Sequence, residues 1–156
     1  MRRKKYVGNI GQIFSVQRIE LKDGRADGAV LVNVRNRSGM HFYVNMRRGM
    51  DIPFLDFFGE NIGYISPAGV VTPQYFDDRD LGFLKSFTVG FLTTCGLKLA
   101  GAPCEYEGLE FGLHGNFSNT PADHFNYEIV ENRWIPYAEI RGTVREAVIF
   151  GDKMKL

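Results

Sequence analysis

The sequence lacks the features that mark several large protein classes. It contains no run approaching the roughly 18 apolar residues that a membrane-spanning helix needs. Its charges nearly cancel, with 19 Lys and Arg against 18 Asp and Glu, whereas nucleic-acid binders usually carry a basic excess. The only cysteines, Cys95 and Cys104, lack C-x-x-C spacing, which disfavours structural zinc and predicts reduced, buried thiols. We therefore expect no nucleic-acid, membrane or metal partner.

Motifs for cofactors and for common hydrolases are missing as well. The chain has no glycine-rich phosphate loop, no H-E-x-x-H pattern and no G-x-S-x-G elbow. His114 and His124 lie ten residues apart, which is a weak pattern for a shared metal. We predict that the protein uses no cofactor and no metal.

The N-terminus is basic from Arg2 to Lys5 but does not continue as a secretory signal would. The residues that follow are polar and interrupted by glycine, where a signal peptide has an apolar run. We therefore predict a basic tail over residues 1–10 and a cytoplasmic location.

Abundant glycine and aromatic residues, with alternating apolar and polar positions, predict a single all-β domain over residues 1–156. The 18 glycines indicate many turns, and residues 73–85 leave room only for one or two helical turns. Residues 49–69 are expected to hold only short strands, and residues 101–121 a long irregular stretch. Strands are predicted at 12–21, 28–36, 40–46, 63–65, 86–94, 127–131, 134–141 and 143–150. The first three of these strands are expected to form an antiparallel meander, and a turn is expected at 132–133.

The first group of candidate site residues follows the strand predicted at 40–46. Arg48 and Asp51 flank Gly49 and Met50 there, so a guanidinium and a carboxylate could project together into a cleft. The guanidinium is a fixed fork of donors that suits sugar hydroxyls or carboxylates. The alternative is an internal Arg–Asp pair that braces the turn before Pro53.

The second group lies in the glycine-rich stretch 112–121. His114 stands between Leu113 and Gly115, and an accessible imidazole can transfer protons or bind hydroxyls near neutral pH. Asn116 and Asn119 are polar neighbours of the kind that a hydroxyl-rich ligand requires. The alternative is a loop whose polar side chains only satisfy its own backbone.

Taken in order, several blocks of the chain resemble a bacterial family of aldose 1-epimerase-like proteins related to galactose mutarotases. The T-T-C-G-L block and the L-H-G block followed by S-N-T-P-A are the specific ones. The matching blocks are Val7–Ile10, Arg48–Ile52, Ile65–Gly69, Leu92–Leu97, Gly112–Gly115, Ser118–Ala122 and Arg141–Glu146.

This resemblance implies an antiparallel β-sandwich of the galactose mutarotase-like (supersandwich) type, with a sugar site over one sheet. It implies acid–base interconversion of sugar anomers, in which a base takes the anomeric hydroxyl proton and an acid protonates the ring oxygen. By analogy His114 is the catalytic acid or a sugar contact, and Arg48 holds hydroxyls. Asp51 would orient Arg48 or bind a hydroxyl itself, and Asn116 and Asn119 complete the substrate-binding set.

The chain also departs from the family pattern. Arg47 stands where relatives tend to have an acidic residue, and Asn116 where they tend to have arginine. The resemblance also implies that family members are longer and that this chain corresponds to their N-terminal half, without the catalytic carboxylate. The chain would then be a fragment, a truncated gene product or half of a sandwich that is completed by association. Lys153–Leu156 alternates like a strand that is still entering a sheet. We therefore expect catalysis only if a second half completes the fold, and a homodimer through exposed sheet edges. The alternative function is a non-catalytic sugar-binding or assembly module.

Overall fold

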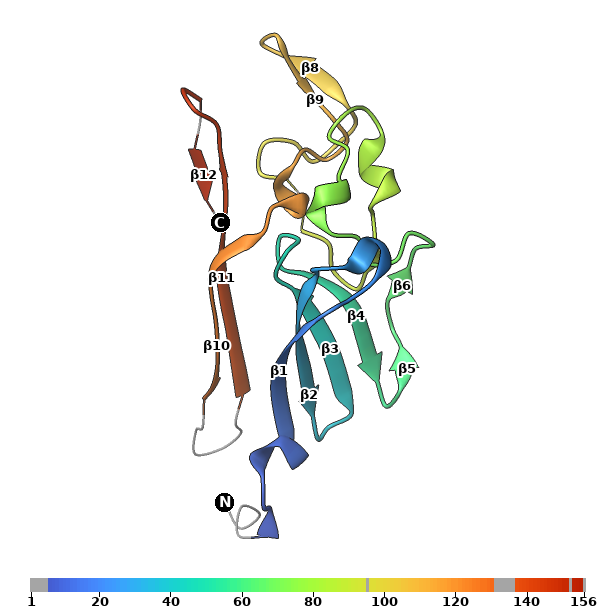
Figure 1. Ribbon diagram of the computed structural model, residues 1–156, viewed down its shortest axis with the longest axis vertical. Helices are drawn as coiled ribbons and strands as arrows, with labels where there is room; N and C mark the ends of the chain where they lie inside the picture. The colour runs from blue at the N-terminus through green and yellow to red at the C-terminus, as the bar shows by residue number, and fades with distance from the viewer. Residues whose placement is uncertain (1–5, 95, 131–136, 152, 156) are drawn as a thin grey trace.

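The computed structural model describes residues 6–94, 96–130, 137–151 and 153–155, in which every element longer than four residues is a β-strand (Figure 1). The predicted all-β class is therefore confirmed. No helix in these residues is long and apolar enough to cross a membrane. The basic cluster at 2–5, Cys95 and the turn expected at 132–133 lie outside the described residues.

A five-stranded antiparallel sheet forms the first layer. Its first three strands are the predicted meander, in which alternate apolar residues of each strand face the core. The strands follow one another in chain order: β1 (Phe14–Glu20), β2 (Val30–Asn36), β3 (Met40–Asn45), β4 (Asp51–Phe57) and β5 (Glu60–Asn61).

Strand β4 corrects the expectation that residues 49–69 hold only short strands. It runs for seven residues in spite of Pro53. Tyr43 pairs with Phe54 and Asn45 with Asp51, so β4 has one extra residue here. In such a bulge the missing N–H of proline costs no ladder hydrogen bond, which explains why the proline does not end the strand.

The second layer is a three-stranded antiparallel sheet made by the C-terminal part of the chain. Strand β11 is continuous where two strands, 134–141 and 143–150, were expected. Gly142 does not end it but serves a close contact, because a Cβ there would lie 2.6 Å from the sulfur of Met50. The strands are β10 (Ala122–Val130), β11 (Tyr137–Ala147) and β12 (Lys153–Lys155), with β11 in the centre.

The two layers pack face to face around one apolar core. Val30, Val32 and Val34 occupy alternate positions of β2 and are 4%, 0% and 3% exposed. Partly buried side chains of the β10–β11 hairpin pack against this cluster, and Figure 1 shows the hairpin alongside the five-stranded sheet. The hairpin residues in this contact are Phe125, Ile129, Ala138 and Ile140.

Short elements connect the two sheets, and those from η4 to η6 gather at one end of the sandwich (Figure 1). Residues 101–121 are not irregular throughout, since they contain a hairpin whose turn residues Glu107 and Gly108 have φ values of 51° and 75°. The strand expected at 86–94 is reduced to two residues. The short strands are β6 (Tyr64–Ile65), β7 (Val89–Gly90), β8 (Cys104–Tyr106) and β9 (Leu109–Phe111), and the 3₁₀ helices are η2 (Ile10–Gln12), η3 (Gly24–Ala26), η4 (Pro73–Tyr75), η5 (Gly82–Lys85) and η6 (Phe117–Asn119).

Cys104 also corrects a prediction made from composition. Its residue is exposed on the β8–β9 hairpin, not buried. A two-stranded hairpin that projects from the sandwich has no second layer to cover it, so a small apolar side chain there faces solvent.

Candidate functional site

The connection between β3 and β4 places Arg48 in the interior. Its residue is 1% exposed, and its Nη1 donates a hydrogen bond to the carbonyl oxygen of Ser86. Among the described residues, Nε and Nη2 of Arg48 have no hydrogen-bond partner. Burial lowers the pKa of Arg48, and the charge of Asp51 opposes that shift. The guanidinium thus braces the turn instead of lying on an open surface.

Asp51 lies beside Arg48 and is also buried, with 6% exposure. Its carboxylate accepts a hydrogen bond of 2.6 Å from the backbone N–H of Thr94. Burial raises the pKa of Asp51 to about 6, against the hydrogen bonds from Thr94 and the charge of Arg48. A buried carboxyl with a pKa near neutrality can hold or release a proton at physiological pH.

Gly49 joins this segment to the second predicted group. Its N–H donates to the carbonyl of Thr120 at 3.0 Å, and the hydroxyl of Thr94 donates to the Gly49 carbonyl at 2.7 Å. Gly49 has a φ of 51°, and a Cβ there would lie 3.3 Å from the Cα of Ser118. Only glycine combines this conformation with so close an approach. The residue after Ser118 is Asn119, so the fold brings this member of the second group to the buried segment that carries Arg48 and Asp51.

Asn119 contributes polar atoms to the interior beside this segment. It is 6% exposed, and its Nδ2 lies 3.3 Å from the hydroxyl of Ser118. Its Oδ1 has no hydrogen-bond partner within the part of the chain that the structure describes. Asn119 therefore lies in the interior with Arg48 and Asp51.

His114 occupies a tightly held turn at the other end of the same stretch. The turn is closed by a 3.1 Å hydrogen bond from the N–H of Gly115 to the carbonyl of Gly112. His114 has a φ of 60°, which is uncommon outside glycine. Its N–H donates to the carbonyl of Gly101 at 2.9 Å, so the backbone is fixed. Its half-buried ring packs edge-on against Phe83, with ring centroids 5.2 Å apart.

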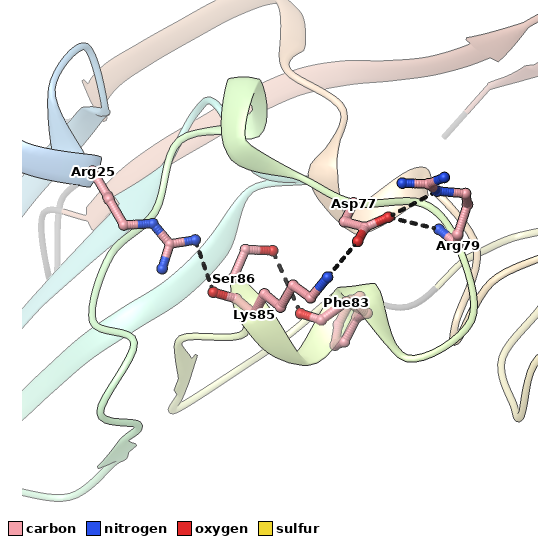
Figure 2. A network of polar contacts seen from close by, with 6 residues as sticks. All are labelled: Arg25, Asp77, Arg79, Phe83, Lys85 and Ser86. Atoms are coloured by element: carbon pink, nitrogen blue, oxygen red, sulfur yellow. Dashed lines mark hydrogen bonds and ion pairs between the residues drawn. The ribbon is translucent and has the colours of Figure 1, made fainter.

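A polar network holds the turn that carries Phe83 (Figure 2). Asp77 lies at its centre and accepts hydrogen bonds from Nζ of Lys85 at 2.6 Å and from the N–H of Arg79 at 3.2 Å. The guanidinium of Arg25 donates to the carbonyl of Lys85 at 2.9 Å. These contacts come from three separate segments, so the turn has a fixed position.

This turn contacts both groups of candidate residues. Phe83 packs against the ring of His114, and three residues later Ser86 accepts the hydrogen bond of Arg48. The imidazole therefore contacts η5 and the guanidinium contacts Ser86, the residue that follows η5, although 66 residues separate His114 from Arg48 in the sequence.

Asn116 has a different environment from Arg48, Asp51 and Asn119. It is exposed and lines a cavity of about 200 Å³ together with Gly115, the residue after His114. Lys98 and Glu146 line the same cavity but were not predicted from the sequence. Of the two, only Glu146 had a sequence signal, because it is the last residue of a block that matches the family. The full lining is Asp78, Gly96, Lys98, Leu99, Leu109, Glu110, Phe111, Gly112, Gly115, Asn116, Glu146 and Val148.

Comparison with known families and structures gives this geometry a context. Residues 26–156 match a family described as "Domain of unknown function (DUF4432)". The chain is similar to a solved structure described as a "putative aldose 1-epimerase" from Klebsiella pneumoniae subsp. pneumoniae MGH 78578, with 26% identity and a TM-score of 0.82. The match covers 91% of this chain and 38% of that one. No curated protein matches the chain. The predicted resemblance and its fold are confirmed.

Proposed function

The chain belongs to the DUF4432 family, and we propose that it is a sugar-binding part of an aldose 1-epimerase-like protein. The single observation that carries this proposal is the similarity to the epimerase-like structure at a TM-score of 0.82 over 91% of the chain. The chain spans only 38% of that structure, so the activity of a whole epimerase is proposed here and not transferred.

His114 is not itself one of the residues that line the cavity of about 200 Å³, and a role for it in sugar chemistry is supported by its position directly before two residues that do. The backbone of His114 is fixed by hydrogen bonds. Such a fixed imidazole can hold a proton for the sugar ring oxygen while a base removes the proton of the anomeric hydroxyl. Proton transfer of this kind accelerates a reaction by about 10²–10⁴-fold, provided that the groups are positioned on both sides of the anomeric carbon.

The site would be supported mainly by three residues that hold its loops in place, Arg48, Asp51 and Asn119. Each is buried, and Arg48 reaches the His114 region through the turn that contains Phe83 and Ser86. We propose that they position the loops of the sugar site, while Asn116 contacts the sugar from the cavity wall.

Titration calorimetry with D-glucose, D-galactose and D-mannose tests this proposal. We expect the parent chain to bind at least one of these sugars and His114→Ala to weaken that binding by about tenfold, the loss of one hydrogen bond to a polar ligand. His124→Ala is the matched control, because His124 also has a positive φ, 49°, but lies exposed on β10. No binding by the parent, or equal binding by both variants, contradicts the assignment.

A second candidate function is a sugar-binding module without catalysis. One observation favours it: the Asp51 carboxylate is 6% exposed and engaged by Thr94, so it is not displayed beside His114 as a free base. Sugar binding without any acceleration of anomer exchange would select this function.

A further inference from the structure

We infer that Glu146 is a ligand-binding residue of the sugar site, where its carboxylate accepts hydrogen bonds from sugar hydroxyls. This inference rests on the proposed function and adds a specific residue to it. Glu146 comes from β11, on the second sheet, whereas His114 and Asn116 come from the loop that precedes η6. The site would therefore be built from the second sheet and from the segments that connect the two sheets.

The position of Glu146 along β11 is unusual for a charged residue. Side chains two apart on a strand share one face, so Glu146 lies in the same row as Ile140 and Val144. Ile140 packs against the core and Val144 is 3% exposed. Glu146 is itself half-buried, whereas its neighbours Arg145 and Ala147 are exposed. A carboxylate thus ends the row that faces the core.

The row ends at the cavity that Asn116 lines. Glu146 of β11 and Val148, which follows the strand, form one wall, and Gly115 and Asn116 form another from the His114 turn. Lys98 adds a cationic donor to the same lining. The lining offers amide and ammonium donors, a carboxylate acceptor and apolar patches, which match a small molecule that carries both hydroxyls and C–H faces.

A competing explanation is that Glu146 only protects a strand edge. Charged residues that point inward do discourage edge-to-edge pairing. Glu146 pairs with Met154 of β12 on one side of β11, whereas on the other side the pairing with β10 ends at Val144. Edge protection does not explain why the half-buried carboxylate of Glu146 lines a cavity.

The test compares Glu146→Gln with Glu139→Gln on the full chain. Glu139 lies on the same strand but on the opposite face, where it pairs with Arg141 at 2.7 Å. The probe is whichever of D-glucose, D-galactose and D-mannose the parent binds, together with its 6-phosphate. Loss of the charged acceptor should weaken sugar binding about tenfold. It should also raise the affinity for the 6-phosphate relative to the free sugar, because one repelling charge is removed.

The outcomes separate this inference from the proposal beneath it. Weaker binding and a shifted phosphate preference in Glu146→Gln, with neither in Glu139→Gln, support it. Unchanged affinity and preference in Glu146→Gln, while the parent binds sugar, overturn the inference and leave the proposed function standing. A parent chain that binds no sugar overturns both. Glu146→Asp keeps the charge, so it should retain the parent's phosphate preference even if Glu146→Gln folds poorly.

Discussion

Arg48 and Asp51 carry ionisable side chains that favour water, yet both lie in the interior. Both are buried, and burial lowers the pKa of Arg48 while it raises the pKa of Asp51 to about 6. The sequence predicted that they act together, either in a cleft or as an internal brace, but it contains no signal for their depth. Their burial arises from Ser86, Thr94 and the 118–120 segment, which are far away in the chain.

Asp51 predicts a specific pH dependence of stability. Because its folded pKa lies above the ordinary 3.8, the folded state favours the neutral carboxyl. Its contribution is therefore complete below about pH 4 and is lost as pH rises through about 6. Asp51→Asn removes the titration and keeps an oxygen for the N–H of Thr94. Its free energy of unfolding, relative to the parent, should rise by up to about 3 kcal/mol between those limits.

Urea unfolding of both proteins at about pH 4, 5, 6 and 7 measures this difference. Asp27→Asn is the control, since Asp27 is exposed and pairs with Lys22 only at 3.9 Å. Parallel stability curves for Asp51→Asn and the parent would contradict the assignment of the titration to Asp51.

At the scale of elements, regular alternation was readable from the sequence and tertiary exceptions were not. Strands β1 to β3 follow the predicted segments because their apolar residues alternate toward one core. Strand β4 was missed because its bulge accommodates Pro53, and β11 was divided because Gly142 serves a contact with Met50. In both cases a residue that usually breaks a strand is tolerated for a reason that lies in another segment.

The packing of the β10–β11 hairpin on the first sheet predicts an unequal effect of two identical substitutions. Ile140 packs against the core, whereas Ile149 is 81% exposed at the connection to β12. Ile140→Ala should lower the free energy of unfolding by about 2 kcal/mol, because it removes buried methyl groups. Ile149→Ala should change it by less than about 0.5 kcal/mol. Equal effects in thermal or urea unfolding would mean that the two sheets do not share this core.

At the scale of the whole molecule, the ordered blocks predicted the epimerase-like fold, and the comparisons confirm it. The site was predicted only in part. Of the predicted residues Asn116 lines the cavity, whereas Lys98 and Glu146 line it without having been predicted, because a cavity formed by segments far apart in the chain has no linear pattern. The roles of all five predicted site residues, and the cytoplasmic location, stay predictions.

The homodimer through exposed sheet edges also stays a prediction, and exposed apolar side chains beside the edge strand β12 would contribute to it. Ile149 is 81% exposed and Val148 is 58% exposed at the tip between β11 and β12. Analytical ultracentrifugation over a range of concentrations should show a dimer that dissociates on dilution, and Ile149→Ser should weaken it. A single monomeric species at every concentration would contradict the predicted homodimer.

Exchange NMR on a panel of aldoses tests the central claim most directly. If the chain is a sugar-binding part of an aldose 1-epimerase-like protein, at least one aldose signal should broaden or transfer saturation in its presence. If the chain alone carries a working acid–base pair, the exchange between α and β anomers should also accelerate, and His114→Ala should abolish that acceleration. The absence of both binding and accelerated exchange with every aldose of the panel would contradict the claim.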